Sequence, residues 1–170
     1  NDERIIFYCK GVIETVRQLG WAPDIIHCQG WFASLVPMYI KKLYAEEPLF
    51  DNVQIIYSVF DNSFDGVLSN SLVDKLLFEK LKGSDISRLQ KPNIQNLHKF
   101  AIDYADAVVQ ASPNIDKDVL SHIKSSGKPF MQYPGREDYV PAYQDFYNQF
   151  ISEEEELEEH SKDEVVVIES

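Results

Sequence analysis

The chain has 170 residues, of which 44% are hydrophobic and 26% charged, a balance typical of one soluble globular domain with a real core. No apolar run approaches the roughly 20 residues that cross a bilayer, and no basic stripe of the kind that binds nucleic acid is present. These features predict a protein with no membrane and no nucleic-acid partner. The two cysteines, Cys9 and Cys28, lie in apolar patterns and are expected to be buried, free thiols, which fits a reducing cytoplasm best.

The net charge of −12 is unevenly distributed. Residues 153–170 hold nine acidic residues and one lysine, a charge of −8, which leaves −4 for residues 1–152. A run of glutamates cannot bury apolar surface. We therefore expect a domain over residues 1–152 and an acidic, disordered tail over 153–170, in which the apolar patch 165–168 has no evident partner.

Helical and strand patterns alternate along the chain. The expected order is a helix over 5–19, a strand over 24–28, a helix over 31–43, a strand over 53–60, helices over 72–81 and 94–104, a strand over 107–111, a helix from 113, a short strand over 129–133 and an aromatic helix over 139–150. Residues 82–93 are expected to form a loop. Strands that are apolar on both faces and alternate with helices predict an α/β fold, with a three-layer, Rossmann-like parallel sheet.

Helix ends are also marked in the sequence. Gly20 and Gly127 follow the last residues of helical patterns and are expected to end two helices. Asn93 is placed to cap the N-terminus of the helix over 94–104. Ser112 is expected to cap the next helix, with Pro113 at its first position.

Ligands bind open parallel sheets at the carboxyl ends of the strands. This rule selects the loops that begin at Gln29, Asp61 and Ser112. Gly30 allows a ligand to approach the backbone closely, and Trp31 can stack on a sugar ring, although a tryptophan that opens a helix more often packs in the core. From composition alone, the site is a polar binding site of unknown ligand.

The histidines give little chemical signal. His27 lies inside a strand, where a lone histidine is more often a hydrogen-bonded core residue than a catalytic one. His98, His122 and His160 are expected on solvated helix faces or in the tail. The sequence contains no phosphate-binding loop, dinucleotide fingerprint, metal-ligand cluster or nucleophile elbow, so neither a metal nor a cofactor is expected.

Three stretches together resemble the N-terminal catalytic domain of bacterial glycogen synthases and plant starch synthases. Residues 21–37 (WAPDIIHCQGWFASLVP) are similar to the family segment Pro-Asp, two apolar residues, His-x-His-Asp-Trp and a later Pro. Residues 55–66 resemble the family's second strand and its loop, and residues 96–112 (NLHKFAIDYADAVVQAS) resemble a helix–strand step. The ending, residues 126–147, resembles short single-domain synthase-like proteins of some bacteria. The resemblance covers about residues 4–150.

The resemblance implies the N-terminal half of a GT-B glycosyltransferase of glycogen biosynthesis. Such enzymes transfer glucose from ADP-glucose to the 4-hydroxyl of an α-1,4-glucan with retention of configuration. The substrate-binding positions carried over to this sequence are Gln29, Gly30, Trp31, Phe60, Asp61 and Asn62. The implied partners are an α-glucan acceptor and, only with segments missing from this chain, ADP-glucose.

The departures from the family pattern bear on activity. The family's His-Asp-Trp is Gln29-Gly30-Trp31 here, and its His-Asn pair after the second strand aligns with Phe60 and Asp61. The family's Lys-x-Gly-Gly donor motif and nucleotide-binding half are not in this sequence. No residue is therefore assigned as catalytic. The sequence favours a weak or inactive glucosyltransferase domain, with a non-enzymatic glucan-binding or regulatory module on the same scaffold as the alternative.

Overall fold

The computed structural model describes residues 1–61, 67–79 and 81–151. Its helices and strands are α1 (Asp2–Leu19), β1 (Ile25–Gln29), α2 (Val36–Lys42), β2 (Gln54–Val59), α3 (Ser71–Phe78), α4 (Ile94–Tyr104), β3 (Ala107–Gln110), α5 (Lys117–Ser125), β4 (Phe130–Met131) and α6 (Tyr139–Asn148). Short 3-10 turns lie at Trp31–Ala33, Pro48–Phe50 and Ser87–Gln90. The predicted order of helices and strands is confirmed. None of the helices in these three ranges is long and apolar enough to cross a membrane.

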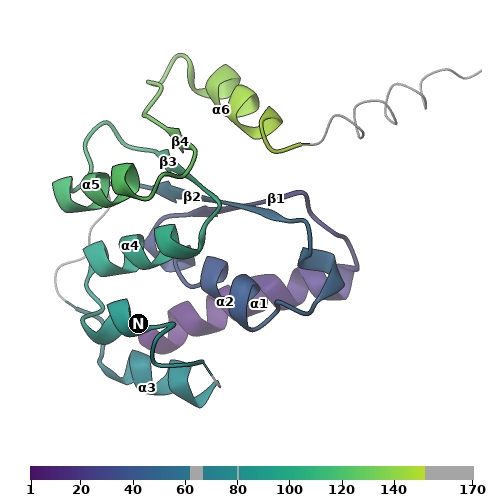
Figure 1. The fold of residues 1–170 in the computed structure, drawn as a ribbon, viewed down its shortest axis with the longest axis vertical. Helices are drawn as coiled ribbons and strands as arrows, with labels where there is room; N and C mark the ends of the chain where they lie inside the picture. Colours follow the sequence, from purple (N-terminus) through teal and green to yellow (C-terminus); the bar gives the residue numbers. More distant parts are fainter. Residues whose placement is uncertain (62–66, 80, 152–170) are drawn as a thin grey trace, which may run out of the picture.

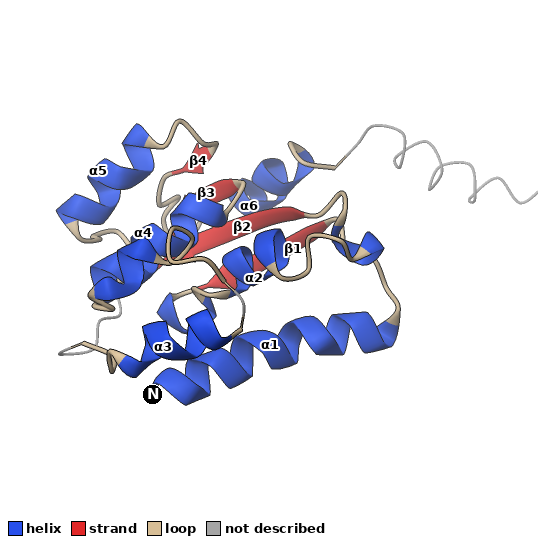
Figure 2. Ribbon diagram, turned by 60° about the horizontal axis from the view of Figure 1, so that its bottom comes forward, coloured by secondary structure: helices blue, strands red, loops and turns tan. Residues whose placement is uncertain are grey.

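The four strands form one parallel sheet in the order β1-β2-β3-β4. In the register of the sheet, His27 of β1 lies beside Ile56 of β2, and Tyr57 of β2 lies beside Val108 of β3. The predicted parallel pairing of the strands is confirmed. Figure 1 shows α1 to α4 on one side of the sheet and α6 on the other, and Figure 2 shows the strands following one another from β4 to β1. The three-layer parallel architecture is therefore also confirmed.

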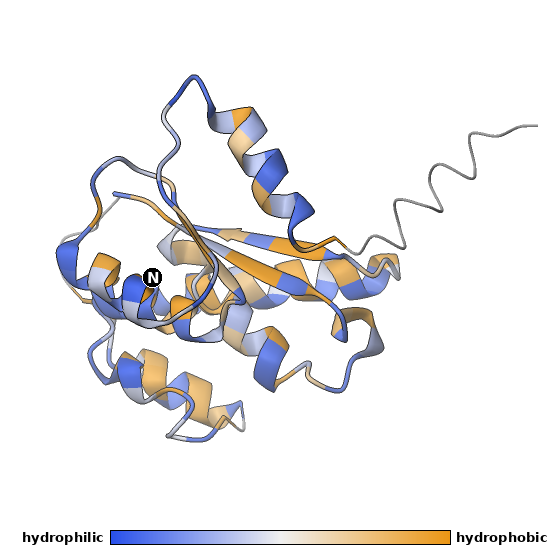
Figure 3. Ribbon diagram, turned by 45° about the horizontal axis from the view of Figure 1, so that its top comes forward, coloured by the Kyte–Doolittle hydropathy of each residue, from blue (hydrophilic) through white to orange (hydrophobic). Residues whose placement is uncertain are grey.

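The two faces of the sheet bury different sets of side chains because strand residues alternate between faces. Ile55, Tyr57 and Val108 face the main core, which α1 to α5 build together. Ile56 and Val109 face a smaller cluster with Phe146 of α6. Figure 3 shows hydrophobic and hydrophilic stretches alternating along α6, as expected of a helix that covers a sheet with one side only.

The predicted helix ends are mostly correct. Gly20 follows α1 in the left-handed conformation, with φ 63°, and Gly127 follows α5 with φ 68°. The Asn93 side chain accepts a hydrogen bond from the Asn96 amide and caps α4. These local signals act as predicted because each satisfies backbone groups that a helix end leaves open.

Two predictions about helices are wrong in detail. The helix expected from Pro113 begins at Lys117, because Asp116 caps it by accepting bonds from the amides of Asp118 and Val119. The Ser112 hydroxyl instead accepts a bond from the Asp61 amide. The helix expected over 31–43 is a 3-10 turn followed by α2, since Pro37 has no amide to continue an α-helical ladder through this point.

One of the histidines that we expected on a solvated helix face is buried. His98 is 3% exposed, not solvated, and its Nδ1 lies 2.8 Å from the hydroxyl of Tyr57. Cys9 and Cys28 are buried and free, as predicted, and burial raises the pKa of the Cys9 thiol to about 12. His160 and the tail expected over 153–170 lie outside the described residues.

Candidate functional site

A cavity of about 270 Å³ lies at the carboxyl ends of the strands. The ends of three neighbouring strands supply Gln29, Phe60 and Ala111, and the chain after β4 adds a turn at Gly135, with φ 88°. The remaining wall comes from this turn and from α6, and consists of Tyr133, Pro134, Tyr139, Tyr143 and Tyr147. The cavity therefore lies where the open-sheet rule predicts a ligand site.

The tyrosines of α6 form a continuous aromatic wall. The ring centroids of Tyr139 and Tyr143 are 4.8 Å apart, and those of Tyr143 and Tyr147 are 5.9 Å apart. Residues four positions apart share one side of a helix, so the sequence spacing of these tyrosines already indicated a common face. It did not indicate that this face turns back onto the strand ends, and none of the four cavity tyrosines was among the predicted site residues.

His27 connects β1, β2 and α6 beneath this wall. Its Nδ1 lies 2.6 Å from the Tyr147 hydroxyl, and its Nε2 lies 2.7 Å from the hydroxyl of Ser58. Burial lowers the pKa of His27 to about 4, so the ring is neutral at pH 7. A neutral imidazole donates at one nitrogen and accepts at the other. His27 is thus a hydrogen-bonded residue, as the strand context predicted, and its contact with Tyr147 connects α6 to the sheet.

Gln29 is the last residue of β1, whereas Gly30 and Trp31 begin the 3-10 turn that follows the strand. Gly30 has φ 73° and ψ 175°, a region that residues other than glycine rarely occupy. An aspartate, which the family pattern quoted above would place at this position, would be strained in this backbone. Trp31 packs against the main core and meets the Phe32 ring edge to face, with centroids 5.2 Å apart. Trp31 does not line the cavity.

The second predicted loop is only partly described. Phe60 lines the cavity. Asp61 is exposed, and its amide is held by Ser112 at 2.9 Å, which connects the loops after β2 and β3. Asn62 lies outside the described residues. Of the six predicted site residues, Gln29 and Phe60 are therefore brought together at the cavity, whereas Gly30, Trp31 and Asp61 are neighbours of it along the chain.

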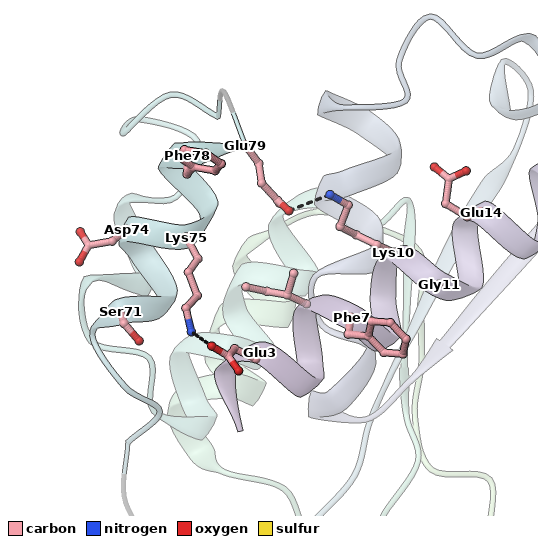
Figure 4. A pocket seen from close by; sticks show the side chains of 11 residues that line it. Glu3, Phe7, Lys10, Gly11, Glu14, Ser71, Asp74, Lys75, Phe78 and Glu79 are labelled. Atoms are coloured by element: carbon pink, nitrogen blue, oxygen red, sulfur yellow. Dashed lines mark hydrogen bonds and ion pairs between the residues drawn. The ribbon is translucent and has the colours of Figure 1, made fainter.

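A larger hollow lies elsewhere, between α1 and α3 (Figure 4). It has a volume of about 890 Å³, and Phe7 and Phe78 stand beside it, 82% and 90% exposed. Its two lysines are already paired, Lys10 with Glu79 at 2.8 Å and Lys75 with Glu3 at 2.9 Å. Exposed apolar patches of this kind mark interaction surfaces or ligand-binding grooves, and the hollow lies away from the carboxyl ends of the strands.

The chemistry available at the strand ends is that of a neutral binding site. The residues that line the cavity carry no charge. Within the described ranges, no group of three or more His, Cys, Asp or Glu side chains is placed to hold a metal ion. Phenol rings offer flat apolar faces and hydroxyl groups, and Gln29 offers an amide. This combination suits a polar, uncharged ligand with both apolar faces and hydroxyls, such as a sugar ring.

Fold and site define the chain as a parallel α/β domain with a ligand cavity at its strand ends. The family profile described as the starch synthase catalytic domain matches residues 1–129. This chain belongs to that family, and the predicted family resemblance is confirmed.

Among relatives, a glycogen synthase of Chlorobaculum parvum is 38% identical over 130 residues, which cover 73% of this chain and 25% of the relative. A glycogen synthase of Aeromonas hydrophila is 27% identical over 162 residues, or 86% of this chain and 32% of the relative. The chain thus spans about a quarter to a third of the length of these relatives.

A solved structure supports the fold. It is described as the catalytic domain of starch synthase IV from Arabidopsis thaliana bound to ADP and acarbose. The TM-score is 0.58 at 22% identity, and the match covers 78% of this chain and 29% of that one. The GT-B assignment of the fold is confirmed, since the matched structure is a catalytic domain of this kind.

Proposed function

We propose that this chain is a glycogen or starch synthase-like glucosyltransferase domain that holds an α-glucan acceptor at the strand ends. The observation that carries this proposal is the uncharged aromatic lining of the 270 Å³ cavity. Tyrosine rings pack on the apolar faces of pyranoses while their hydroxyls bond sugar hydroxyls. A nucleotide diphosphate needs cationic or amide partners, and the lining offers no lysine or arginine.

We further infer that the 170-residue chain by itself does not transfer glucose. Phe60 and Gly30 stand where the family pattern has a histidine and an aspartate. Preorganised polar groups usually contribute most of the stabilisation of a transition state, and losing one polar contact costs about 1–3 kcal/mol. ADP-glucose is the donor only when polypeptide absent from this chain completes the site.

The alternative is a non-enzymatic glucan-binding or regulatory module on the same scaffold. The same cavity favours it, because binding requires the aromatic wall but not an acid, a base or a nucleotide site. A Lys-x-Gly-Gly motif upstream of Asn1 in the gene supports the transferase. Its absence supports the module.

Ligand titration followed by amide NMR tests the binding site. Maltohexaose is expected to shift amides near Gln29 and Tyr139 at millimolar concentration, and ADP-glucose is expected to bind more weakly or not at all. Tyr139→Ala should weaken maltohexaose binding about tenfold, equivalent to about 1.4 kcal/mol. Val140→Ala is the matched control, because Val140 is 58% exposed against 53% for Tyr139, lies on the same helix and does not line the cavity. Shifts that cluster elsewhere, or tighter binding of ADP-glucose than of the glucan, would contradict the site.

Activity is measured separately. Incubation of the chain with labelled ADP-glucose and glycogen is expected to give no incorporation above a heat-treated sample. Clear incorporation would show that the substitutions at Gly30 and Phe60 do not abolish transfer.

A further inference from the structure

Four polar side chains form a continuous hydrogen-bond network beneath the aromatic wall. The Tyr147 hydroxyl lies 2.6 Å from His27 Nδ1, and His27 Nε2 lies 2.7 Å from the Ser58 hydroxyl. Burial raises the pKa of Tyr143, and a hydrogen bond between its side chain and Ser58 opposes that rise. The rings of His27 and Tyr143 lie side by side, with centroids 5.8 Å apart. The network therefore runs from Tyr147 through His27 and Ser58 to Tyr143.

Both ends of this network reach the candidate cavity, whereas its middle does not. Tyr143 and Tyr147 are half-buried and line the cavity at the strand ends. Ser58 is fully buried and His27 is partly buried, and neither lines this cavity. A ligand in the cavity therefore meets the network through the two tyrosine hydroxyls.

The number of protons in the network fixes what its two ends offer. Each hydroxyl carries one proton, and the neutral imidazole of His27 carries one. When Nε2 carries this proton, the Tyr147 hydroxyl donates to Nδ1, and its oxygen remains to accept from a ligand. Nε2–H then donates to Ser58, and Ser58 donates to Tyr143. The hydroxyl of Tyr143 remains to donate to the ligand.

The other tautomer of His27 reverses every bond and gives the same pair of groups. Nδ1–H donates to the Tyr147 oxygen, so the Tyr147 hydroxyl remains to donate to a ligand. Ser58 donates to Nε2 and accepts from Tyr143, whose oxygen remains to accept. In both tautomers, one tyrosine offers a donor and the other offers an acceptor, and the change between them moves protons only.

We infer that this network makes the cavity specific for two neighbouring hydroxyls of one sugar ring, one of which donates while the other accepts. A sugar hydroxyl can do either, so a neighbouring pair fits both tautomers. A ring that lacks one of the two leaves an end of the network unpaired, which weakens binding. His27 is a positioning residue, because it acts through Tyr147 and Ser58. The inference rests on the proposed function and names the part of the sugar that the site contacts.

Deoxy glucosides test this specificity. The dissociation constants of methyl α-D-glucopyranoside and of its 2-deoxy, 3-deoxy and 4-deoxy derivatives are measured by amide NMR on the 170-residue chain. The 3-hydroxyl belongs to both neighbouring pairs of this ring. We therefore expect the 3-deoxy derivative and one of the other two to bind about fivefold more weakly than the parent. The remaining derivative keeps the contacted pair and should bind within about twofold of the parent.

Substitutions of His27 test its role. His27→Phe removes both ring nitrogens, so the two tyrosine hydroxyls rotate independently. We expect the ratio of the 3-deoxy and parent dissociation constants to fall from about five to below about two, with an unchanged circular dichroism spectrum. His27→Gln keeps a donor and an acceptor and should retain most of the ratio. A residue that only held the wall in place would change all four affinities by the same factor and leave the ratio as it is.

Two tyrosine substitutions give a matched pair that keeps the aromatic rings. Tyr147→Phe removes one end of the network and should also lower the ratio below about two, which provides the test if His27→Phe does not fold. Tyr139→Phe is the control, because Tyr139 lines the same cavity and contacts Tyr143 through its ring but lies outside the network. It should leave the ratio at about five.

Equal binding of all four glucosides would overturn the inference, as would a ratio that persists in Tyr147→Phe. Maltohexaose separates the inference from the proposed function. If the glucosides show the expected ratio and maltohexaose does not bind, the glucan function fails and the inference stands. If maltohexaose binds and the deoxy glucosides bind like the parent, the function stands and the inference fails. The absence of binding by any of these sugars would overturn both.

Discussion

The face of the sheet under α1 to α5 packs against a large apolar core, whereas the face under α6 has a small apolar cluster; each face also holds one hydroxyl–imidazole contact, Tyr57–His98 on the first and Tyr147–His27 on the second. On the first face, Phe100 and Leu97 are 1% and 0% exposed. On the second, Phe146 packs beside the His27–Tyr147 hydrogen bond. The candidate cavity opens at the edge of this second, thinner layer. The binding wall therefore belongs to the layer that contributes less to the main core.

The largest effect is expected on the first face. Phe100→Ala removes a fully buried ring from the main core and should lower the free energy of unfolding by about 3–5 kcal/mol. Urea denaturation followed by circular dichroism measures it. A loss below about 1 kcal/mol would mean that the main core does not hold the fold as described.

The next largest effect is expected from acid, which should destabilise both faces of the sheet. Burial lowers the pKa of His98, on the first face, and of His27, on the second, to about 4, against an ordinary value of about 6.5. The unfolded chain therefore binds more protons between about pH 6.5 and 4, so stability falls as pH falls through that window. For the buried His98 the full effect is about 3 kcal/mol.

Urea midpoints at pH 7 and pH 5 check this sign. His98→Gln should flatten the pH dependence, whereas His122→Gln, at a more exposed position, should leave it nearly as it is. Greater stability at pH 5 than at pH 7 would contradict the placement of the buried His98 and the partly buried His27.

A smaller effect is expected from Phe146→Ala on the second face. Phe146 is 5% exposed, so truncation should undock α6, but the state with α6 released keeps the main core. We expect a loss of about 1–3 kcal/mol, faster hydrogen exchange in α6, unchanged exchange in β2, and weaker maltohexaose binding. Equal acceleration in β2 would show that the two layers unfold as one unit.

The smallest effect is expected from removing residues 153–170. A stretch that carries −8 buries little apolar surface. The melting temperature should change by less than about 5 °C. A larger drop would show that the apolar patch at 165–168 packs on the domain, on either face or at the β1 edge.

The sequence by itself determined the order of helices and strands, the parallel sheet and most helix ends. These features depend on residues that are close together in the chain: the apolar runs of β1 and β2, Gly20 after α1, and the Asn93 cap of α4. The start of α5 was misjudged because Asp116 competes with Ser112 as a cap, and only the loop contacts of Ser112 decide between them.

The tertiary structure alone decided how the site is assembled. The His98–Tyr57 contact joins residues 41 positions apart, and the His27–Tyr147 contact joins residues 120 apart. Periodicity cannot predict such pairs, because it says which side of a helix is apolar and not which surface that side meets. For this reason the sequence pointed to Gln29 and Phe60 at the strand ends but missed the tyrosines, which α6 brings there only by packing back across the sheet.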